Sequence, residues 1–432
     1  MTNAMQEKLY QRVGVISEFL VYVLVGITPV FFLPFTADFF DYNKQFLIFA
    51  GAIFAVIAWT AQTLIKRMLR LTVSPATLAV VAVAVAYLLS SFFATPYLDE
   101  ALLGRSLLIF SLTVLFIFAT SVGREMKARW FLVAATIGGL LASTLTALEF
   151  AGFGLSKLMS FLLKLDIGGS NFFHPTGSIL AGALFLAPLI VANGVEAFAK
   201  KSVWRVVHGV FAGVLTAAFI FHIWLMLPGK PTSLTTPSFG ASWSIAIDTL
   251  KDPRTAFLGV GPESYLVAFT QFRPANMNLT PTWNLRFLQA SNEPLNLLTT
   301  LGVVGFCAWI FLIIAGIKTA LPLKTESRSL VVLLGVAFLE QLFFPANPTL
   351  LVLVYLTLVA LVLLEKQKRD SSVSDLIFHV FAIKIVSPDA SVRTEQHVAT
   401  TAVTVILSIA LLAGAATSAY VVGKTYAQEH LL

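Results

Sequence analysis

Three arginines in this sequence are well suited to bind an anionic group: Arg105, Arg273 and Arg286. Arg105 lies at the start of an apolar segment, whereas the other two lie in a long mixed segment between two apolar runs. The planar guanidinium group can bind two phosphate oxygens at once. We therefore predict that these three side chains bind a phosphate or pyrophosphate group.

Groups that could take part in proton transfer lie near the same segments: Glu293, Ser291 and His174. A carboxylate beside an apolar segment is a functional candidate, although Glu293 could equally be the ion-pair partner of Arg286. His174 follows a stretch rich in Gly and Asn that cannot form a regular helix. This histidine could act as a base or have a structural role.

The composition places these residues in a membrane protein. Of 432 residues, 57% are hydrophobic and only 12% are charged, and the mean hydropathy is +0.85. Soluble globular proteins carry about 25% charged residues. Runs of about 20 apolar residues, the length that spans a bilayer as a helix, recur along the chain. We predict an all-α polytopic integral membrane protein with about 11 transmembrane helices.

The charges beside the apolar runs predict the topology. The predicted spans are 13–34, 45–65, 77–94, 106–121, 130–150, 178–198, 206–227, 296–317, 329–344, 348–365 and 400–422. Most of the 29 basic residues lie in alternate connections, which the positive-inside rule assigns to the cytoplasm. We therefore expect a cytoplasmic N-terminus and an extracytoplasmic C-terminus. The net charge of +7 then reflects topology, and we expect no nucleic-acid partner.

The three arginines are informative because this topology puts them on the outer side, against the rule. The alternative is that long basic side chains there reach lipid headgroups, which would account well for Lys44 and Lys157. It accounts less well for Arg286, which lies between Trp283 and Phe287.

The topology divides the chain into five sections. They are a seven-span bundle (1–227), a large extracytoplasmic loop (228–295), three further spans (296–365), a cytoplasmic loop (366–399), and a last span with a short outer stub (400–432). In the large loop we predict helices at 238–250 and 262–272. The alternative for this loop is a cap on the membrane surface without chemistry. In the cytoplasmic loop, residues 374–384 have an apolar face, which predicts an amphipathic helix on the inner leaflet.

The start of the eighth span carries a recognisable pattern. Asn292, nine residues, Gly302, two residues and Gly305 follow one another here. This spacing resembles the motif of the O-antigen ligase and polymerase superfamily, which stands at the end of a large periplasmic loop. The family's motif begins with His, and that position holds Ser291. Gly261, in Val-Gly-Pro-Glu, resembles a Gly-x-Gly element of the same loop.

The resemblance implies a glycosyltransferase of bacterial cell-envelope polysaccharide or lipopolysaccharide biosynthesis, located in the cytoplasmic membrane. Such enzymes move a glycan from an undecaprenyl (polyprenyl) pyrophosphate carrier to an acceptor hydroxyl of a glycan, lipid or protein on the outer face. The reaction needs no cofactor, and the pyrophosphate leaving group gains charge that arginines can stabilise. Asp38 and Asp41 lack the Asp-x-Asp spacing of metal-dependent enzymes, so we predict no metal site.

The replacement of the family's histidine leaves the catalytic base open, because the hydroxyl of Ser291 cannot take up a proton near neutral pH. Glu293 or His174 could substitute, the acceptor could need no base, or the activity could be lost; we prefer Glu293. The remaining motif positions are expected to be structural, with glycines that allow close helix packing: Asn292, Gly302, Gly305 and Gly261.

Two other functions remain open. A flippase or transporter of an anionic lipid-linked substrate would also need positive charge in a cavity, but the spans contain few charges and show no internal repeat. A catalytically inactive relative acting in glycan assembly would explain Ser291.

Overall fold

The computed structural model describes residues 3–33, 38–66, 68–123, 126–157, 160, 173–199, 203–324, 327–368, 373–379, 414, 416–417 and 419–424. The α-helices are α1 (Asn3–Ile27), α2 (Asp41–Lys66), α3 (Pro75–Phe93), α4 (Leu98–Leu103), α5 (Arg105–Val122), α6 (Ala128–Phe150), α8 (Ile179–Ala199), α9 (Val203–Met226), α10 (Phe239–Thr249), α11 (Pro253–Leu258), α12 (Tyr265–Phe272), α13 (Glu293–Ala320), α14 (Arg328–Gln341) and α15 (Pro348–Lys366). Two short 3-10 helices, η2 (Ala275–Leu279) and η3 (Leu321–Leu323), follow α12 and α13.

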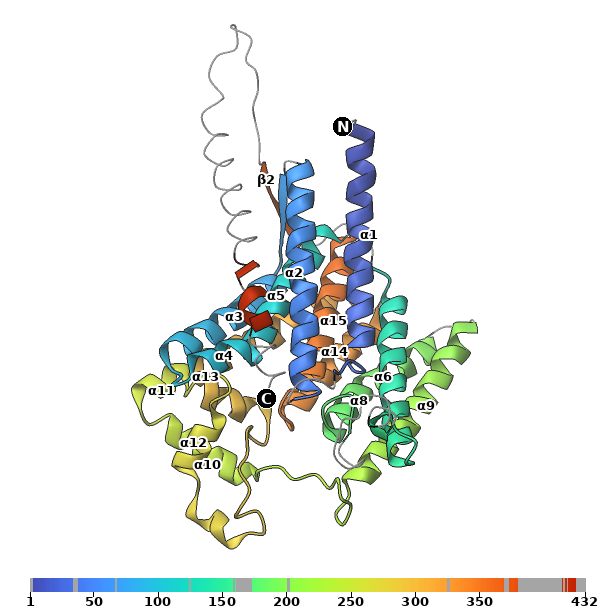
Figure 1. Cartoon of the computed structure of the whole chain (residues 1–432). Coiled ribbons are helices and arrows are strands. Elements are labelled where there is room, and N and C mark those ends of the chain that lie inside the picture. Colours follow the sequence, from blue (N-terminus) through green and yellow to red (C-terminus); the bar gives the residue numbers. More distant parts are fainter. Residues whose placement is uncertain are drawn as a thin grey trace.

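The long apolar runs form the helices of a membrane bundle (Figure 1). Within the described residues, eight helical stretches are long and apolar enough to cross a bilayer. This finding confirms the all-α polytopic fold. Two further predicted spans are shorter: the apolar part of α1 is Val13–Ile27, and α14 has 14 residues. The predicted span at 400–422 and the outer stub lie mostly outside the described residues.

Helix α15 lies at the centre of the bundle. Leu and Val cover all of its faces, and 89% of its apolar window is buried inside the protein. A helix that is apolar all round is stable only when neighbours surround it. Its neighbours are α1, α2, α5, α6, α8, α13 and α14.

Three of the spanning helices begin with the same local chemistry. Asn292 caps α13, Asn347 caps α15 and Ser74 caps α3, each accepting a hydrogen bond from a backbone N–H of the first turn. In each case proline follows within the first two helical positions, where its missing N–H costs nothing. These caps fix where the helices start, and therefore which residues lie at the bundle's ends.

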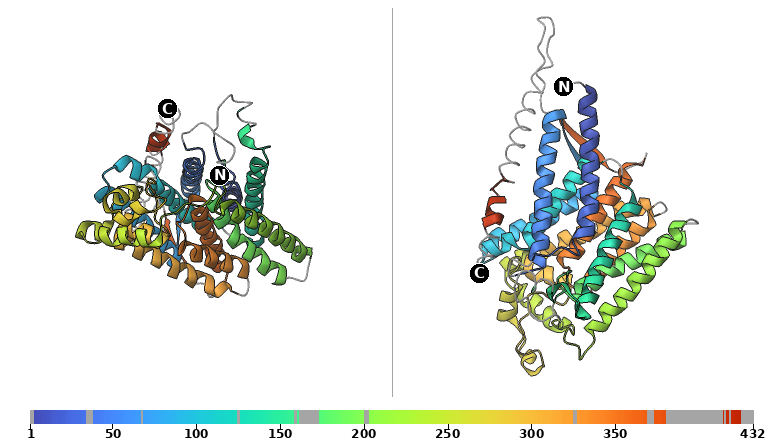
Figure 2. Two further views of the ribbon diagram at one scale, coloured as in Figure 1. Left: turned by 90° about the horizontal axis from the view of Figure 1, so that it is seen from below. Right: turned by 45° about the vertical axis from the view of Figure 1, so that its right-hand side comes forward.

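The ends of the bundle differ. Figure 1 shows the N-terminus and the strands β1 (Met68–Val73) and β2 (Ser374–His379) at one end, and α10, α11 and α12 towards the other. We call the second end, from which residues 227–292 project, the loop end. Figure 2 shows the same separation from two further directions.

The segment at 374–379 is a strand, so the predicted amphipathic helix at 374–384 is wrong for these residues. Strand β2 pairs antiparallel with β1, with Thr72 opposite Asp375. Asp375 accepts a hydrogen bond of 2.7 Å from the Thr72 hydroxyl and lies 2.9 Å from the ammonium group of Lys366. The segment forms a strand because the backbone groups of β1 pair with it at this end of the bundle.

The long loop is a folded unit packed on α13. Helix α10 matches the predicted helix at 238–250, whereas α12 begins at Tyr265, three residues later than predicted. The later start follows from the backbone of Glu263, whose φ of +60° is not helical. The loop has its own apolar core, which includes Ile245, Tyr265, Phe269, Phe287 and Leu295. Leu295 belongs to α13, so this core joins the loop to the bundle.

Candidate functional site

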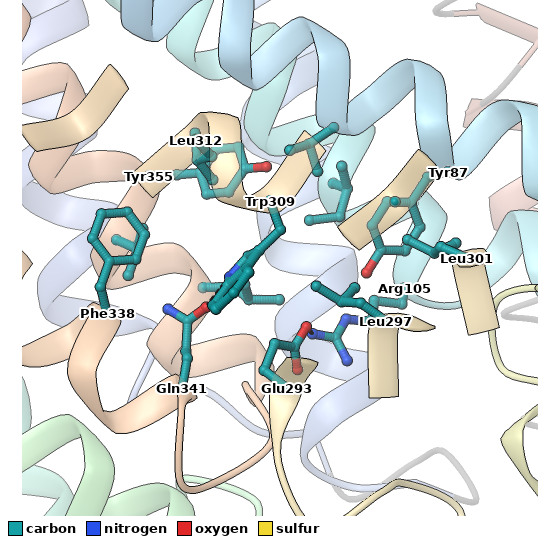
Figure 3. Close-up of a pocket in the computed structure, with 15 residues that line it drawn as sticks. Tyr87, Arg105, Glu293, Leu297, Leu301, Trp309, Leu312, Phe338, Gln341 and Tyr355 are labelled. Atoms are coloured by element: carbon teal, nitrogen blue, oxygen red, sulfur yellow. Dashed lines mark hydrogen bonds and ion pairs between the residues drawn. The ribbon is translucent and has the colours of Figure 1, made fainter. Parts of the chain in front are cut away.

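The centre of the candidate site is a buried ion pair at the loop end. Arg105 begins α5 and Glu293 begins α13, and their side chains meet with Nη2 of Arg105 2.5 Å from Oε1 of Glu293 (Figure 3). The two side chains are only 12% and 3% exposed. The second carboxylate oxygen of Glu293 accepts a 2.9 Å hydrogen bond from the backbone N–H of Ala346. Glu293 therefore pairs with Arg105, and not with Arg286 as we had considered.

A small cavity lies beneath this ion pair, between α3, α5, α13, α14 and α15. Tyr87, Tyr355 and Trp309 line it together with the ion pair, and the Tyr87 hydroxyl points towards Arg105 (Figure 3). Its volume of about 20 Å³ is enough for one water molecule and far too small for a sugar. No ligand larger than a water molecule can therefore contact Arg105 through this cavity.

Glu263, in the long loop, contacts the first residue of α5. Its carboxylate accepts a 2.8 Å hydrogen bond from the backbone N–H of Arg105, and the residue is exposed. Among the described residues it is the only non-glycine with a positive φ, at +60°. Such a conformation costs about 1–3 kcal/mol, and conformations of this kind cluster at functional sites. Sequence reasoning missed Glu263, although it lies only two residues after the Gly-x-Gly element.

Two glycines allow the loop segment before Glu263 to contact α13 where this helix is broken. Gly302 has a φ of +65° inside the helix, and a side chain at this position would collide with the backbone of Phe257. Gly259 has a φ of +70°, and a side chain there would collide with the backbone of Thr300. The role of Gly302 is therefore to let the helix break and the loop approach, and not to bring two helices together.

Backbone hydrogen bonds complete this contact. The N–H groups of Val260 and Gly261 donate to the carbonyl groups of Thr299 and Thr300, both at 3.0 Å. Gly261 itself leaves room for Thr95. Gly305, one turn further along α13, leaves room for the side chain of Leu301 and lines the small cavity. The loop backbone that carries Glu263 is thereby fixed to the helix that carries Glu293.

The other two motif residues are structural. The Asn292 side chain caps α13 through the N–H of Leu295 at 3.1 Å and donates to the carbonyl of Leu342 at 3.1 Å. The backbone N–H of Ser291 donates to the hydroxyl of Ser242 in α10 at 3.0 Å. Burial in the apolar core of the loop raises the pKa of Tyr265 above its ordinary value.

His174 lies in a segment packed against the start of α2. Phe173 makes edge contacts with Phe32 and Phe40 at centroid distances of 5.0 and 5.2 Å. Gly177, with a φ of +97°, lies directly against the Asp41 carboxylate. This segment therefore lies at the loop end, where the start of α2 holds it.

Lys44, which we expected at lipid headgroups, is fully buried. Its ammonium group donates to the Phe40 carbonyl at 3.2 Å and lies 5.7 Å from the Phe40 ring centroid. The loop end thus holds a second buried cation that sequence reasoning assigned to the membrane surface. The sequence alone cannot distinguish a lysine at a helix start that faces the protein interior from one that faces lipid.

The other two arginines do not join Arg105. Arg273 donates from Nη2 to the carbonyl of Trp283 and lies 5.8 Å from the ring centroid of Phe269. Arg286 is exposed and forms neither a hydrogen bond nor an ion pair within the described part of the chain. The structure therefore brings Arg105 and Glu293 together and places Arg273 and Arg286 elsewhere on the loop.

No protein-family model matches this sequence, and no curated protein matches it either. The resemblance to the O-antigen ligase superfamily rests on the motif residues and their spacing.

Proposed function

We propose that the protein is an O-antigen ligase-like glycosyltransferase of a bacterial cytoplasmic membrane. It transfers a glycan from a polyprenyl-pyrophosphate carrier to an acceptor hydroxyl, and the loop end faces outward while the N-terminus is cytoplasmic. One observation carries this proposal: at the loop end a single residue, Arg105, joins two carboxylates, because its guanidinium group pairs with Glu293 and its backbone N–H donates to the exposed Glu263. The guanidinium group can bind a pyrophosphate, and Glu263 can accept the proton of a hydroxyl group.

In the proposed reaction the acceptor oxygen attacks the anomeric carbon, and the bond from this carbon to the pyrophosphate oxygen breaks. Negative charge grows on the departing pyrophosphate, and Arg105 stabilises it. The ion pair commits only one of the guanidinium nitrogens, Nη2, to Glu293. Among the described residues, Nε of Arg105 has no hydrogen-bond partner. This nitrogen is buried, so in the proposed reaction a phosphate binds the 12% of the Arg105 side chain that remains exposed, in the orientation that the pairing with Glu293 fixes.

We assign the role of the missing histidine to Glu263. Glu293 is the weaker candidate because its two oxygens already bind Arg105 and the Ala346 N–H. The Ser291 hydroxyl cannot take up a proton. Glu263 is exposed, and the Arg105 N–H and an unusual backbone conformation hold its carboxylate in place. The acceptor proton moves to this carboxylate as the new glycosidic bond forms.

Transfer from a labelled lipid-linked glycan in proteoliposomes tests the proposal. Arg105→Ala should abolish transfer, and Glu263→Gln should reduce it about 100-fold or more, because Gln keeps the hydrogen bond to Arg105 but cannot act as a base. Arg205→Ala is the matched control, since this exposed arginine lies at the opposite end of the bundle. Full transfer by a folded Arg105→Ala protein would refute the assignment.

Transport of a lipid-linked anion is the second candidate, and one observation favours it. The spanning helices bury more charge than the sequence suggested, including Lys44, Glu149, Glu196 and Glu293. Buried ionisable groups of this kind often line substrate or ion pathways. A flipping assay with a fluorescent polyprenyl-phosphate lipid in the same proteoliposomes separates the two functions, because a transporter would move this lipid without any acceptor.

A further inference from the structure

A second hollow lies on the long loop, apart from the ion pair. It has a volume of about 780 Å³ and lies between α10, the start of α11 and the end of α12, in the part of the loop that projects from the bundle (Figure 1). Its polar and aromatic lining includes Ser244, Asp248, Lys251, Gln271, Phe272 and Arg273. None of the residues around the ion-pair cavity contributes to it. We call this hollow the loop groove.

The charges of the loop groove balance. Asp248 and Asp252 line it together with Lys251 and Arg273. The ammonium group of Lys251 lies 2.6 Å from the Asp248 carboxylate, and Asp252 accepts hydrogen bonds from the backbone at the start of α11. A pyrophosphate would meet two carboxylates here, which disfavours it. This groove therefore does not suit the anionic part of the proposed donor, although we had predicted Arg273 to bind it.

The same set of groups suits an uncharged polyol. Carboxylates accept hydrogen bonds, Arg273 and Lys251 donate them, and the amide of Gln271 does both. Phe272 adds an apolar surface, and Arg273 is held by the Trp283 carbonyl and the Phe269 ring. A side chain held in this way loses little conformational freedom when a ligand binds. The volume is within the range of small-molecule sites, about 300–1,000 Å³.

We propose that the loop groove binds an uncharged oligosaccharide, the glycan part of a substrate. The proposal rests on the function proposed above, because it names where the glycan is held while Arg105 holds the pyrophosphate. The groove fixes the sugar chain at a distance from the reacting bond, so its binding energy adds to that of the ion-pair region.

Binding of oligosaccharides to the full-length protein in detergent tests this inference. The probes are reducing oligosaccharides released by mild acid from the lipid-linked glycans of the host membrane, and binding is followed by saturation-transfer NMR and calorimetry. The double variant Asp248→Asn, Gln271→Ala removes one acceptor and one amide from the groove. We expect its Kd to rise at least about tenfold. Gln289→Ala, an exposed glutamine of the same loop outside the groove, is the matched control and should bind as the wild type does.

The outcomes separate the inference from the proposed function. Binding that survives in Arg105→Ala but weakens in the double variant supports the groove, whether or not the protein catalyses transfer. Absence of binding by the wild type, or an equal loss in Gln289→Ala, overturns the inference and leaves the Arg105 experiment unaffected. Displacement of the oligosaccharide by inorganic pyrophosphate alone would also overturn it, because the groove would then be an anion site.

Discussion

The buried pair of Arg105 and Glu293 makes a quantitative prediction about stability. Removal of one partner strands a charge whose side chain is at most 12% exposed, which typically costs about 3–5 kcal/mol. Arg105→Met should cost more than Glu293→Gln, because the stranded Glu293 is 3% exposed whereas the stranded Arg105 is 12% exposed. In the double variant no charge is stranded, so we expect a loss of less than about 2 kcal/mol. The coupling free energy should therefore exceed about 3 kcal/mol.

Reversible unfolding in mixed micelles measures the four proteins of this cycle. The chain supplies a matched control in Lys251 and Asp248, which also lie 2.6 Å apart but have side chains 72% and 30% exposed. The coupling of that exposed pair should not exceed about 1 kcal/mol. The reasoning fails if the two cycles give equal coupling, or if the single variants at Arg105 and Glu293 each cost less than about 1 kcal/mol.

Two other predictions concern the break in α13 and the strand pairing. Gly302→Ala should destabilise the protein by more than about 2 kcal/mol, because the new Cβ collides with the Phe257 backbone; Gly335→Ala, in open space on α14, should be neutral or stabilising in the same thermal unfolding assay. Lys366→Gln removes the ion pair with Asp375, so hydrogen exchange of amides 374–379 should accelerate; unchanged exchange would show that the strand does not depend on this contact.

The positions of the helices were largely predictable from sequence, because a spanning helix is a local property of an apolar run. The predicted span at 348–365, for example, corresponds to α15, and Asn347 with Pro348 marks its start. The order of these helices around α15 was not predictable. Contacts between apolar faces determine this order, and they do not change the spacing of apolar residues along the sequence.

The candidate site was predictable only in part. Arg105 stood out through its position, and Glu293 through the motif beside it. Their pairing was not predictable, because it joins residues far apart in the chain, and the sequence offered Arg286 as a nearer partner. The strand at 374–379 was missed for the same reason, since its partner β1 lies about three hundred residues earlier. Glu263 was overlooked because the features that single it out are its positive φ and its hydrogen bond to Arg105, and neither can be read from the sequence.

The break at Gly302 also constrains how the protein is made. It lies nine residues into α13, or about 13 Å along the helix, and the carbonyls of Thr299 and Thr300 there accept hydrogen bonds from residues 260 and 261. In lipid, carbonyls without such donors would cost several kcal/mol. Residues 260 and 261 precede α13 in the chain, so the donors that these carbonyls need come from a segment synthesised before the helix. The stable form of this part of α13 therefore depends on the prior folding of the loop onto it.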